Sequence, residues 1–444
     1  MYRLWRRWLW RITRHNPAMS MSLGGEPSVL IIAPHGSYRT MSFVQAANQL
    51  GIHSIIASRG KHSIVSDYAE GIHIELESEE QAFIELIEAA SSYHFVAVIG
   101  TDDSTATLAA RLSKHLDLPH NDPAAVNISR RKDLARDRLF ESNVPVPEYR
   151  CIELTKELTA QASDLRFPVV VKPVSLSASQ GVIRANNYPE LESAIYRIER
   201  ILLQRDDLSS QAKDRVLIEE FIPGTEVAVE AMLTDGKLQL LTIFDKPDPL
   251  NGPYFEETYY ITPSRLSNVQ QTELVNVIAR ACEAYGLTEG PIHAECRINE
   301  NGIFILEVAA RTIGGLCARL LRFGTGYTLE ELVLMHAMGK TPELKSDIGA
   351  AGVLMIPIPA AGMLKRVEGL LAAQRVPFIE EVNIQVREGY ELVPLPEGSG
   401  YFGFIFSRAP DIHQVEQALR EAHACLKIIT APVWKIESST TCVA

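Results

Sequence analysis

The segment Val169-Val170-Val171-Lys172-Pro173 is followed closely by a loop of small polar residues, Ser175-Leu176-Ser177-Ala178-Ser179-Gln180-Gly181. The three valines predict a short buried strand that ends at a lysine. A lysine can act as a point charge on phosphate oxygens, and a loop rich in serine and glycine can present hydroxyls and backbone N–H groups to them. Each part is a weak signal alone, but together they indicate a phosphate-binding site.

Further charged residues lie on both sides of this segment. Lys132 precedes it, the run Glu219-Glu220-Phe221-Ile222-Pro223-Gly224-Thr225-Glu226 follows it, and Glu295 and Glu307 come later. The two late acids fall on two predicted strands, and carboxylates on neighbouring strands can hold Mg²⁺ between them. With the lysines they predict a site for a nucleotide triphosphate. The chain has no Gly-x-x-x-x-Gly-Lys-Ser/Thr motif, so this site is not a P-loop.

In this order, the residues resemble those of the ATP-grasp superfamily, and the resemblance extends from about Val29 to the C-terminus. The matching parts are Val-Val-Val-Lys172-Pro, the Ser/Gly loop, Glu219 to Ile222 with Gly224 and Glu226, His293-Ala294-Glu295-Cys296-Arg297, Glu307-Val308-Ala309-Ala310-Arg311 and Gly314-Gly315. Within the superfamily, the L-amino-acid ligases and related carboxylate-amine ligases are the most similar group. That closer resemblance rests on Asp245-Lys246-Pro247, Phe255-Glu256-Glu257-Thr258 and Glu307-x-x-x-Arg311-x-x-Gly-Gly.

The resemblance implies ATP as the nucleotide and Mg²⁺ as the metal, with Mn²⁺ as an alternative ion. The implied nucleotide contacts are Lys132 and Lys172 on the phosphates, Ser177, Ser179 and Gly181 in a closing lid, Glu219, Glu220, Phe221 and Ile222 around the adenine, and Glu226 on the ribose hydroxyls. Glu295 and Glu307 would ligate the metal. The family commonly has Asn two residues after the second metal-binding Glu, whereas this chain has Ala309. This departure removes one oxygen ligand and puts a second metal in doubt.

The candidate catalytic residues are Arg311 and His293, and the candidate substrate-binding residues are Glu256, Glu257, Gly314 and Gly315. Arg311 could grip a substrate carboxylate or an acyl phosphate with two hydrogen bonds, the alternative being a structural salt bridge. His293 and Glu295 are two residues apart on a strand and so point to the same face. The histidine either orients the amine or the phosphate, or is a satisfied core residue. We expect the substrate pocket between Arg311 and residues 245–257, unless that Pro-rich, acidic segment is a solvated loop.

The pattern along the chain predicts an α/β and α+β fold. Apolar runs at residues 29–33, 54–57 and 96–99 alternate with helical patterns, which is typical of a parallel sheet. Polar loops at 34–39 and 100–104 follow two of these strands, and we expect both near a site, with Ser104 itself capping the next helix. The predicted units are a basic leader at 1–24, a parallel α/β domain at 25–122, an ATP-grasp domain with antiparallel sheets at 123–345 and a small α+β domain at 346–444.

The composition excludes other classes of protein. Lys and Arg number 43 against 55 Asp and Glu, a net charge of −12, and this acidity argues against nucleic-acid binding. The six cysteines form no Cys-x-x-Cys pair, which favours reduced thiols in the cytoplasm. We expect the Arg-rich leader to be flexible rather than bound to a membrane. Gly398-Ser399-Gly400-Tyr401-Phe402-Gly403 matches a dinucleotide-binding pattern but precedes a strand, so we interpret it as a turn.

From the residues and the resemblance we expect an ATP-dependent carboxylate–amine ligase that forms an amide through an acyl phosphate and releases ADP and phosphate. Its partners would be a small-molecule carboxylate and an amine, and a homodimer is left open. Two alternatives remain. One is an enzyme of the same fold that activates a non-amino-acid carboxylate or an enol, and the acceptor profile would separate it. The other is an inactive nucleotide-binding subunit, suggested by Ala309.

Overall fold

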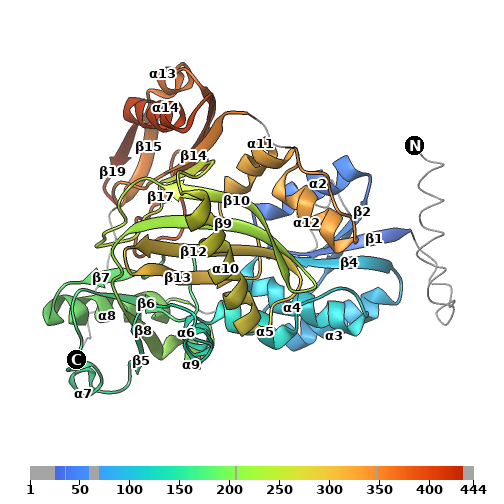
Figure 1. The fold of residues 1–444 in the computed structure, drawn as a ribbon, viewed down its shortest axis with the longest axis horizontal. Helices are drawn as coiled ribbons and strands as arrows, with labels where there is room; N and C mark the ends of the chain where they lie inside the picture. Colours follow the sequence, from blue (N-terminus) through green and yellow to red (C-terminus); the bar gives the residue numbers. More distant parts are fainter. Residues whose placement is uncertain (1–25, 36, 60–69, 206–207, 346–347, 434–444) are drawn as a thin grey trace, which may run out of the picture.

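The computed structural model describes residues 26–35, 37–59, 70–205, 208–345 and 348–433, in which one parallel sheet is combined with three antiparallel sheets (Figure 1). This arrangement confirms the predicted α/β and α+β class. The basic leader, Gly36 and Cys442 lie outside the described residues. Among the described helices, none combines the length and the apolar character needed to cross a membrane.

The N-terminal unit is built on a parallel sheet in the order β3-β2-β1-β4. Its elements are β1 (Pro27–Ile32), α2 (Arg39–Leu50), β2 (His53–Ser58), β3 (Glu70–His73), α3 (Glu79–Ala90), β4 (His94–Gly100) and α4 (Asp103–His115). Leu30, Ile31 and Ile32 are fully buried, as expected for a strand covered on both faces. The expectation that Ser104 caps α4 is wrong. The helix starts at Asp103 and its N-cap is Asp102, two residues before Ser104, which falls in the first turn.

The largest sheet is antiparallel, with the order β13-β12-β9-β10-β11-β14-β18-β16. Its strands are β9 (Thr225–Thr234), β10 (Lys237–Lys246), β11 (Tyr259–Thr262), β12 (Gly290–Asn299), β13 (Gly302–Ala309), β14 (Ala350–Ile356), β16 (Ile379–Ile384) and β18 (Gly403–Ala409). The last three strands come from beyond residue 346, so this central sheet runs across the boundary predicted there. Helix α10 (Asn268–Tyr285) packs on β13 and begins at a capping box formed by Ser267 and Gln270.

A smaller antiparallel sheet, ordered β5-β8-β6-β7, contains the Val169 to Lys172 segment. Its strands are β5 (Tyr149–Glu153), β6 (Val169–Pro173), β7 (Ile183–Ala185) and β8 (Arg215–Glu220), and its helices are α7 (Leu158–Ala162), α8 (Tyr188–Leu203) and α9 (Ser210–Lys213). All of β6 is buried, as its valines predicted. Two helices, α5 (Pro123–Arg130) and α6 (Lys132–Glu141), connect this sheet to the N-terminal unit.

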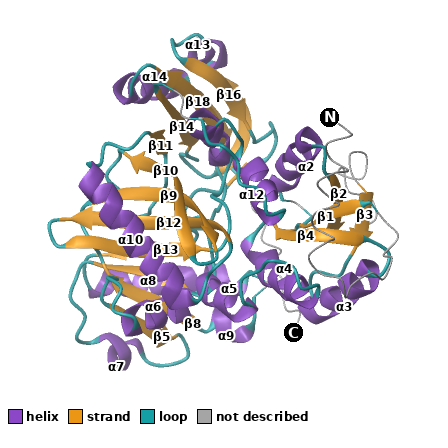
Figure 2. Cartoon of the chain, turned by 45° about the vertical axis from the view of Figure 1, so that its right-hand side comes forward, coloured by secondary structure: helices purple, strands orange, loops and turns teal. Residues whose placement is uncertain are grey.

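The C-terminal residues complete the central sheet and add a small layer above it (Figure 2). The added elements are β15 (Gly362–Glu368), α13 (Leu370–Gln374), β17 (Glu391–Leu392), α14 (Ile412–Cys425) and β19 (Lys427–Ala431), and α14 packs on β14 and β18. The Gly398 to Phe402 stretch is irregular backbone that leads into β18, so it does not open a helix, as the sequence predicted.

One hydrophobic core joins the N-terminal unit to the central sheet. It contains Val29 of β1, Phe43 of α2, Phe244 of β10 and Val353 of β14. The connecting elements are the short helices η2 (Cys317–Leu320) and α11 (Leu321–Thr325) and the helix α12 (Leu329–Ala337). Because α12 contacts α2, β4 and β12, it lies between the two sheets (Figure 2). The loops at the ends of β1 and β4 are thereby fixed against the central sheet.

Candidate active site

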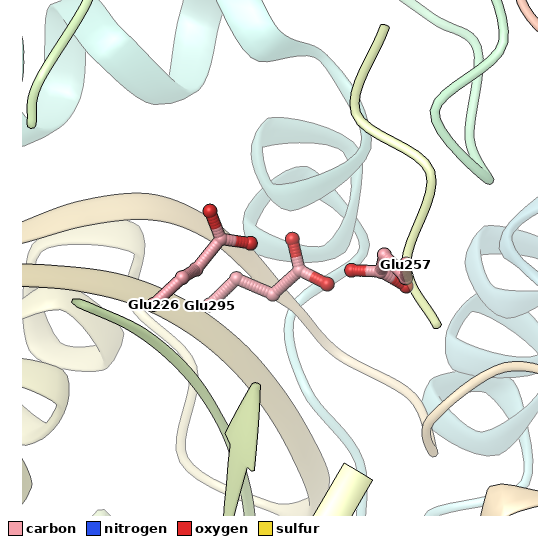
Figure 3. A group of neighbouring side chains, drawn as sticks. All are labelled: Glu226, Glu257 and Glu295. Carbon is pink, nitrogen blue, oxygen red and sulfur yellow. The ribbon is translucent and has the colours of Figure 1, made fainter. Parts of the chain in front are cut away.

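Three carboxylates converge on one face of the central sheet. Glu226 of β9, Glu295 of β12 and Glu257, just before β11, each offer one oxygen, and these oxygens lie within 4.8 Å of one another. Figure 3 shows Glu226 and Glu295 side by side on neighbouring strands, with Glu257 reaching toward Glu295 from the opposite side. Nζ of Lys246, at the end of β10, is 2.8 Å from Glu226 and 3.3 Å from Glu295, and it also donates to Glu257. The ammonium therefore lies among the three acids.

Burial and mutual repulsion control the charge of this carboxylate cluster. Burial and the neighbouring Glu295 raise the pKa of Glu257 to about 7, against the opposing effect of Lys246. Burial would also raise the pKa of Glu295, but Lys246 and His293 outweigh it and hold that pKa well below its usual range. Tyr260 donates its O–H to Glu257 at 2.8 Å. The cluster therefore keeps one firmly ionised carboxylate, Glu295, next to one that titrates near neutral pH.

His293 lies beside Glu295, as the period of two predicted. Its Nε2 is 3.4 Å from Glu295, and its Nδ1 is 2.6 Å from Glu230, whose side chain is completely buried. Burial by itself would lower the pKa of His293, but the two carboxylates outweigh it and raise the pKa to about 9. The ring is thus a buried imidazolium held on both sides.

Glu295 and Glu307, the predicted metal ligands, occupy directly opposite positions on β12 and β13. Opposite residues of an antiparallel pair project to the same face. Glu307 Oε2 lies 3.2 Å from Nζ of Lys132, and that ammonium also donates to the Leu176 carbonyl at 2.8 Å. Ala309 lies opposite His293 in the same register and is buried. The two predicted metal ligands and one predicted phosphate lysine are therefore neighbours.

Lys172 belongs to a buried group of three charges. Its Nζ is 2.5 Å from one oxygen of Glu219, and Nε of Arg136 is 2.5 Å from the other. Arg136, on α6, is 2% exposed and also donates to the carbonyl of Leu306 at 2.6 Å. Burial lowers the pKa of Lys172, with Glu219 opposing the shift. The group ties β6, β8 and β13 together.

The predicted adenine segment is held by a second buried arginine. Arg297 donates to the Ile222 carbonyl at 2.7 Å and to Glu226 at 2.8 Å. The ring of Phe221 has the guanidinium of Arg184 at 4.2 Å and that of Arg297 at 4.9 Å. Arg297 therefore fixes Glu226 relative to this segment.

The predicted lid, residues 175–181, is a sharply turning loop. Ser177 is exposed, Ser179 is half-buried and Gly181 is buried, and Glu220 is exposed at the end of β8. Ala178 and Ser179 have φ of 53° and 54°, and Gly181 has φ of 73°. Left-handed backbone at residues with side chains is uncommon and concentrates in ligand-binding loops.

Both polar loops of the N-terminal unit, which we expected near a site, contact the segment that follows β13. Nε of Arg311 is 2.8 Å from Asp103, at the start of α4. The backbone N–H of Gly315, next to Gly314, donates to the Tyr38 hydroxyl at 2.6 Å. The N-terminal unit therefore closes one side of the candidate site.

Glu256 and Glu257, although adjacent, have different partners. Glu257 joins the carboxylate cluster, whereas Glu256 accepts a hydrogen bond from the backbone N–H of Ile358 at 3.3 Å. Burial raises the pKa of Glu256. The structure thus brings only one of these two predicted substrate residues to the cluster.

Several residues of the site had no individual role in the prediction, although Lys246 and Asp103 lie in segments expected near it: Lys246, Glu230, Arg136, Arg297 and Asp103. Glu230 does carry a signal, because it is the one acid within the apolar strand Val227-Ala228-Val229-Glu230-Ala231-Met232, and a buried carboxylate needs a partner. Arg136 carries none, since its partner Glu219 is 83 residues away in the chain.

Comparison with known proteins identifies two regions of the chain. Residues 165–319 match the ATP-grasp domain, and residues 354–431 match the L-amino acid ligase C-terminal domain 2. The uncharacterized protein y4rH of Sinorhizobium fredii is 24% identical over 400 residues, which cover 88% of this chain and 81% of that protein. Carnosine synthase 1 of Homo sapiens is 27% identical over 267 residues, 57% of this chain, and the chain spans only 32% of that protein's length.

The fold is also shared with a solved structure. The crystal structure of an L-amino acid ligase from Bacillus licheniformis has a TM-score of 0.77 and 24% identity, and the match covers 91% of this chain and 99% of that one. The two matched regions follow each other in the order that the resemblance implied, so the chain carries an ATP-grasp domain followed by an L-amino acid ligase C-terminal domain 2, and it resembles the ADP-forming carbon–nitrogen ligases.

Proposed function

We propose that this chain joins a carboxylate to an amine, making a dipeptide or an amino-acid conjugate, through an acyl phosphate with ADP and phosphate as products. The observation that carries the proposal is the pair of cations beside the two opposed carboxylates, one half-buried (Lys132) and one buried (Lys246). Lys132 lies 3.2 Å from Glu307, and Lys246 lies 3.3 Å from Glu295. Transfer of a phosphoryl group from one anion to another needs such fixed positive charges.

The residues present fit a hard divalent cation, Mg²⁺ or Mn²⁺. Glu295 and Glu307 are carboxylates at opposite strand positions, and such cations prefer carboxylate oxygens. Bound there, the ion would neutralise charge on the phosphate oxygens of ATP. Ala309 supplies no oxygen, so we propose that the ammonium of Lys246 provides fixed positive charge on this face instead.

The proposed reaction assigns the remaining residues. Lys132 and Lys172 bind the phosphates of ATP, the Glu219–Ile222 segment binds adenine and Glu226 binds the ribose. Arg311 holds the substrate carboxylate while an oxygen of that carboxylate attacks the γ-phosphorus of ATP. It then stabilises the tetrahedral intermediate when the amine attacks the acyl phosphate and phosphate leaves.

Water must be kept away from the acyl phosphate, because hydrolysis would return the free carboxylate and phosphate without forming an amide. The lid, residues 175–181, is proposed to close over it. His293 would orient the amine or the phosphate from its place beside Glu295, and Glu257, with Gly314 and Gly315 on the other side, would bind the substrate. The similarity to carnosine synthase and to an L-amino acid ligase supports amino acids as the substrate class.

The test is to incubate the purified protein with Mg²⁺, ATP and amino acids in pairs, to measure ADP and phosphate, and to search by mass for condensed species. ADP and phosphate formed together with a new amide would support the proposal. ATP binding without turnover on any amino-acid pair would favour a non-amino-acid substrate or an inactive subunit. In that case Ala309→Asn, which restores the missing oxygen ligand, is the next variant to assay.

A further inference from the structure

The lid is attached to backbone carbonyls in the C-terminal part of the chain. The N–H of Gly181 donates to the carbonyl of Pro396 at 2.9 Å, and Nε2 of Gln180 donates to the carbonyl of Glu397 at 2.6 Å. Both acceptors belong to the turn at residues 394–398, more than 200 residues further along the chain. One backbone N–H and one side-chain amide of the lid are thus bonded to this turn.

A single arginine on α8 reinforces the attachment. Both Nε and Nη2 of Arg197 donate to the Glu397 carboxylate, the latter at 2.8 Å, so the pair is bidentate. Nη1 of Arg197 donates to the Tyr254 hydroxyl, and the guanidinium lies 5.1 Å from the centre of that ring. Arg197 therefore contacts the 394–398 turn and residues 245–257, where we place the substrate.

The strand that follows the lid contacts the same substrate segment. In β7, the N–H of Arg184 donates to the carbonyl of Pro253 at 2.9 Å, and its Nη1 donates to the carbonyl of Asn251 at 2.7 Å. Ile183 also forms a bridge with Tyr254. Movement of the lid is thus linked to both the substrate segment and the C-terminal turn.

The 394–398 turn is closed by a hydrogen bond of its own and requires glycine at one position. The N–H of Gly398 donates to the carbonyl of Pro394 at 2.9 Å. A Cβ at Gly398 would lie 1.9 Å from the Val393 carbonyl oxygen, so only glycine fits. The side chains of Arg197 and Glu397 are 39% and 41% exposed, and exposed pairs add little to global stability. Breaking the pair is therefore expected to change the lid and leave the fold intact.

We propose that Glu397 is a positioning residue for the reaction: through Arg197 it holds the lid closed and links closure to the segment that carries Tyr254. The inference rests on the proposed function in taking the lid to cover the acyl phosphate. Without the pair the lid opens more often, water reaches the intermediate, and phosphate is released without amide.

The test uses Glu397→Arg, Arg197→Glu and the charge-exchanged double variant, with Asp164→Arg as the matched control. Asp164 forms an exposed pair with Arg150 at 2.6 Å, away from the lid. The first readout is hydrogen–deuterium exchange of the backbone amides of residues 175–182, measured without substrates. We expect several-fold faster exchange in each single variant, near wild-type exchange in the double variant, and no change in the control.

The second readout is the amount of phosphate released per amide formed, which should rise several-fold in the single variants and recover in the double variant. Unchanged lid exchange in both single variants, or additive defects in the double variant, would overturn the inference. Hydrogen–deuterium exchange is measured without substrates and so does not depend on the ligation reaction. Restored exchange in the double variant would therefore support the positioning role of Glu397 even if no amino-acid pair were ligated, and only the proposed function would then fail.

Discussion

Individual charged residues carry most of the chemistry inferred for this site, and their partners set their roles. Lys246 illustrates this, since its ammonium contacts Glu226, Glu257 and Glu295 at once. Together with Asp245 and Pro247, Lys246 contributes to the resemblance to the carboxylate-amine ligases, but these three residues do not predict which side chains the ammonium contacts. The carboxylates lie on two other strands and a loop, so the cluster could be read only from the fold.

Replacing Glu307 by Gln should lower kcat roughly 100-fold, because a neutral amide no longer binds the metal and leaves Lys132 without its partner. Initial rates of ADP formation give the measurement. Glu300→Gln is the matched control, because Glu300 is exposed on the turn between the same two strands, β12 and β13. Equal kcat values for Glu307→Gln and the control would show that Glu307 does not take part in the reaction.

Two adjacent acids of α12 should respond in opposite ways to neutralisation. Burial raises the pKa of Glu330, with Arg39 the nearby cation that opposes the shift. A carboxyl group with a raised folded pKa contributes stability at low pH that is lost as the pH rises through that pKa. Glu330→Gln should therefore raise the free energy of unfolding at pH 7, and this gain should vanish below the unfolded pKa of about 4.3.

Glu331 provides the contrast, because its carboxylate accepts the N–H of Thr328 at 2.7 Å and pairs with Arg322 at 3.2 Å. Glu331→Gln should lower the free energy of unfolding at pH 7. Urea denaturation of both variants at several pH values gives the comparison. A loss of stability at pH 7 in Glu330→Gln as large as that in Glu331→Gln would contradict the assignment.

Among helices and strands, local capping and periodicity explain what could be predicted from sequence. The helices Glu79–Ala90 and Ile412–Cys425 begin just after Ser78 and Asp411, whose side chains accept N–H groups of the first turn. By contrast, β11 was not predicted: its residues, Tyr-Tyr-Ile-Thr, favour a strand, but a run of four is too short to be distinguished by its pattern and is stabilised by its neighbours β10 and β14.

Helix α6 contributes a buried charge whose removal should be costly. Arg136→Ala would leave Glu219 without one of its two cations and the Leu306 carbonyl without a donor, and breaking a buried ion pair typically costs about 3–5 kcal/mol. The midpoint of urea unfolding measures this loss. Arg138→Ala, on the exposed face of the same helix, should stay near wild type. A similar midpoint for both variants would show that the buried triad does not stabilise the fold.

For the molecule as a whole, the sheets and loops predicted from the sequence are present, but their mutual placement follows from long-range contacts. Arg39 is an example: it pairs with Asp102 at 2.6 Å and donates to the Ile313 carbonyl at 3.3 Å, 274 residues away. The sequence placed both N-terminal loops near a site because they follow parallel strands. It could not indicate that they meet the segment after Glu307.

Arg39→Ala should therefore loosen the N-terminal unit from the central sheet. The buried Ile313 carbonyl and the Asp102 carboxylate would lose a charged donor, a loss of about 1.5–3 kcal/mol per hydrogen bond. Limited proteolysis and urea unfolding should show earlier release of residues 26–115. Arg59→Ala, which removes an exposed pair with Glu77 in the same unit, is the control. A urea-unfolding transition of Arg39→Ala that coincides with those of Arg59→Ala and the wild type would contradict a docking role for Arg39.

The central claim is that the chain activates a carboxylate as an acyl phosphate and transfers it to an amine. The most direct measurement supplies the protein with Mg²⁺, ATP and amino-acid pairs whose carboxylates carry ¹⁸O, and follows the label by mass. The account predicts ADP, an amide and one ¹⁸O atom in each phosphate released, in equal amounts. Amide formed with unlabelled phosphate, or with the label in AMP, would contradict it.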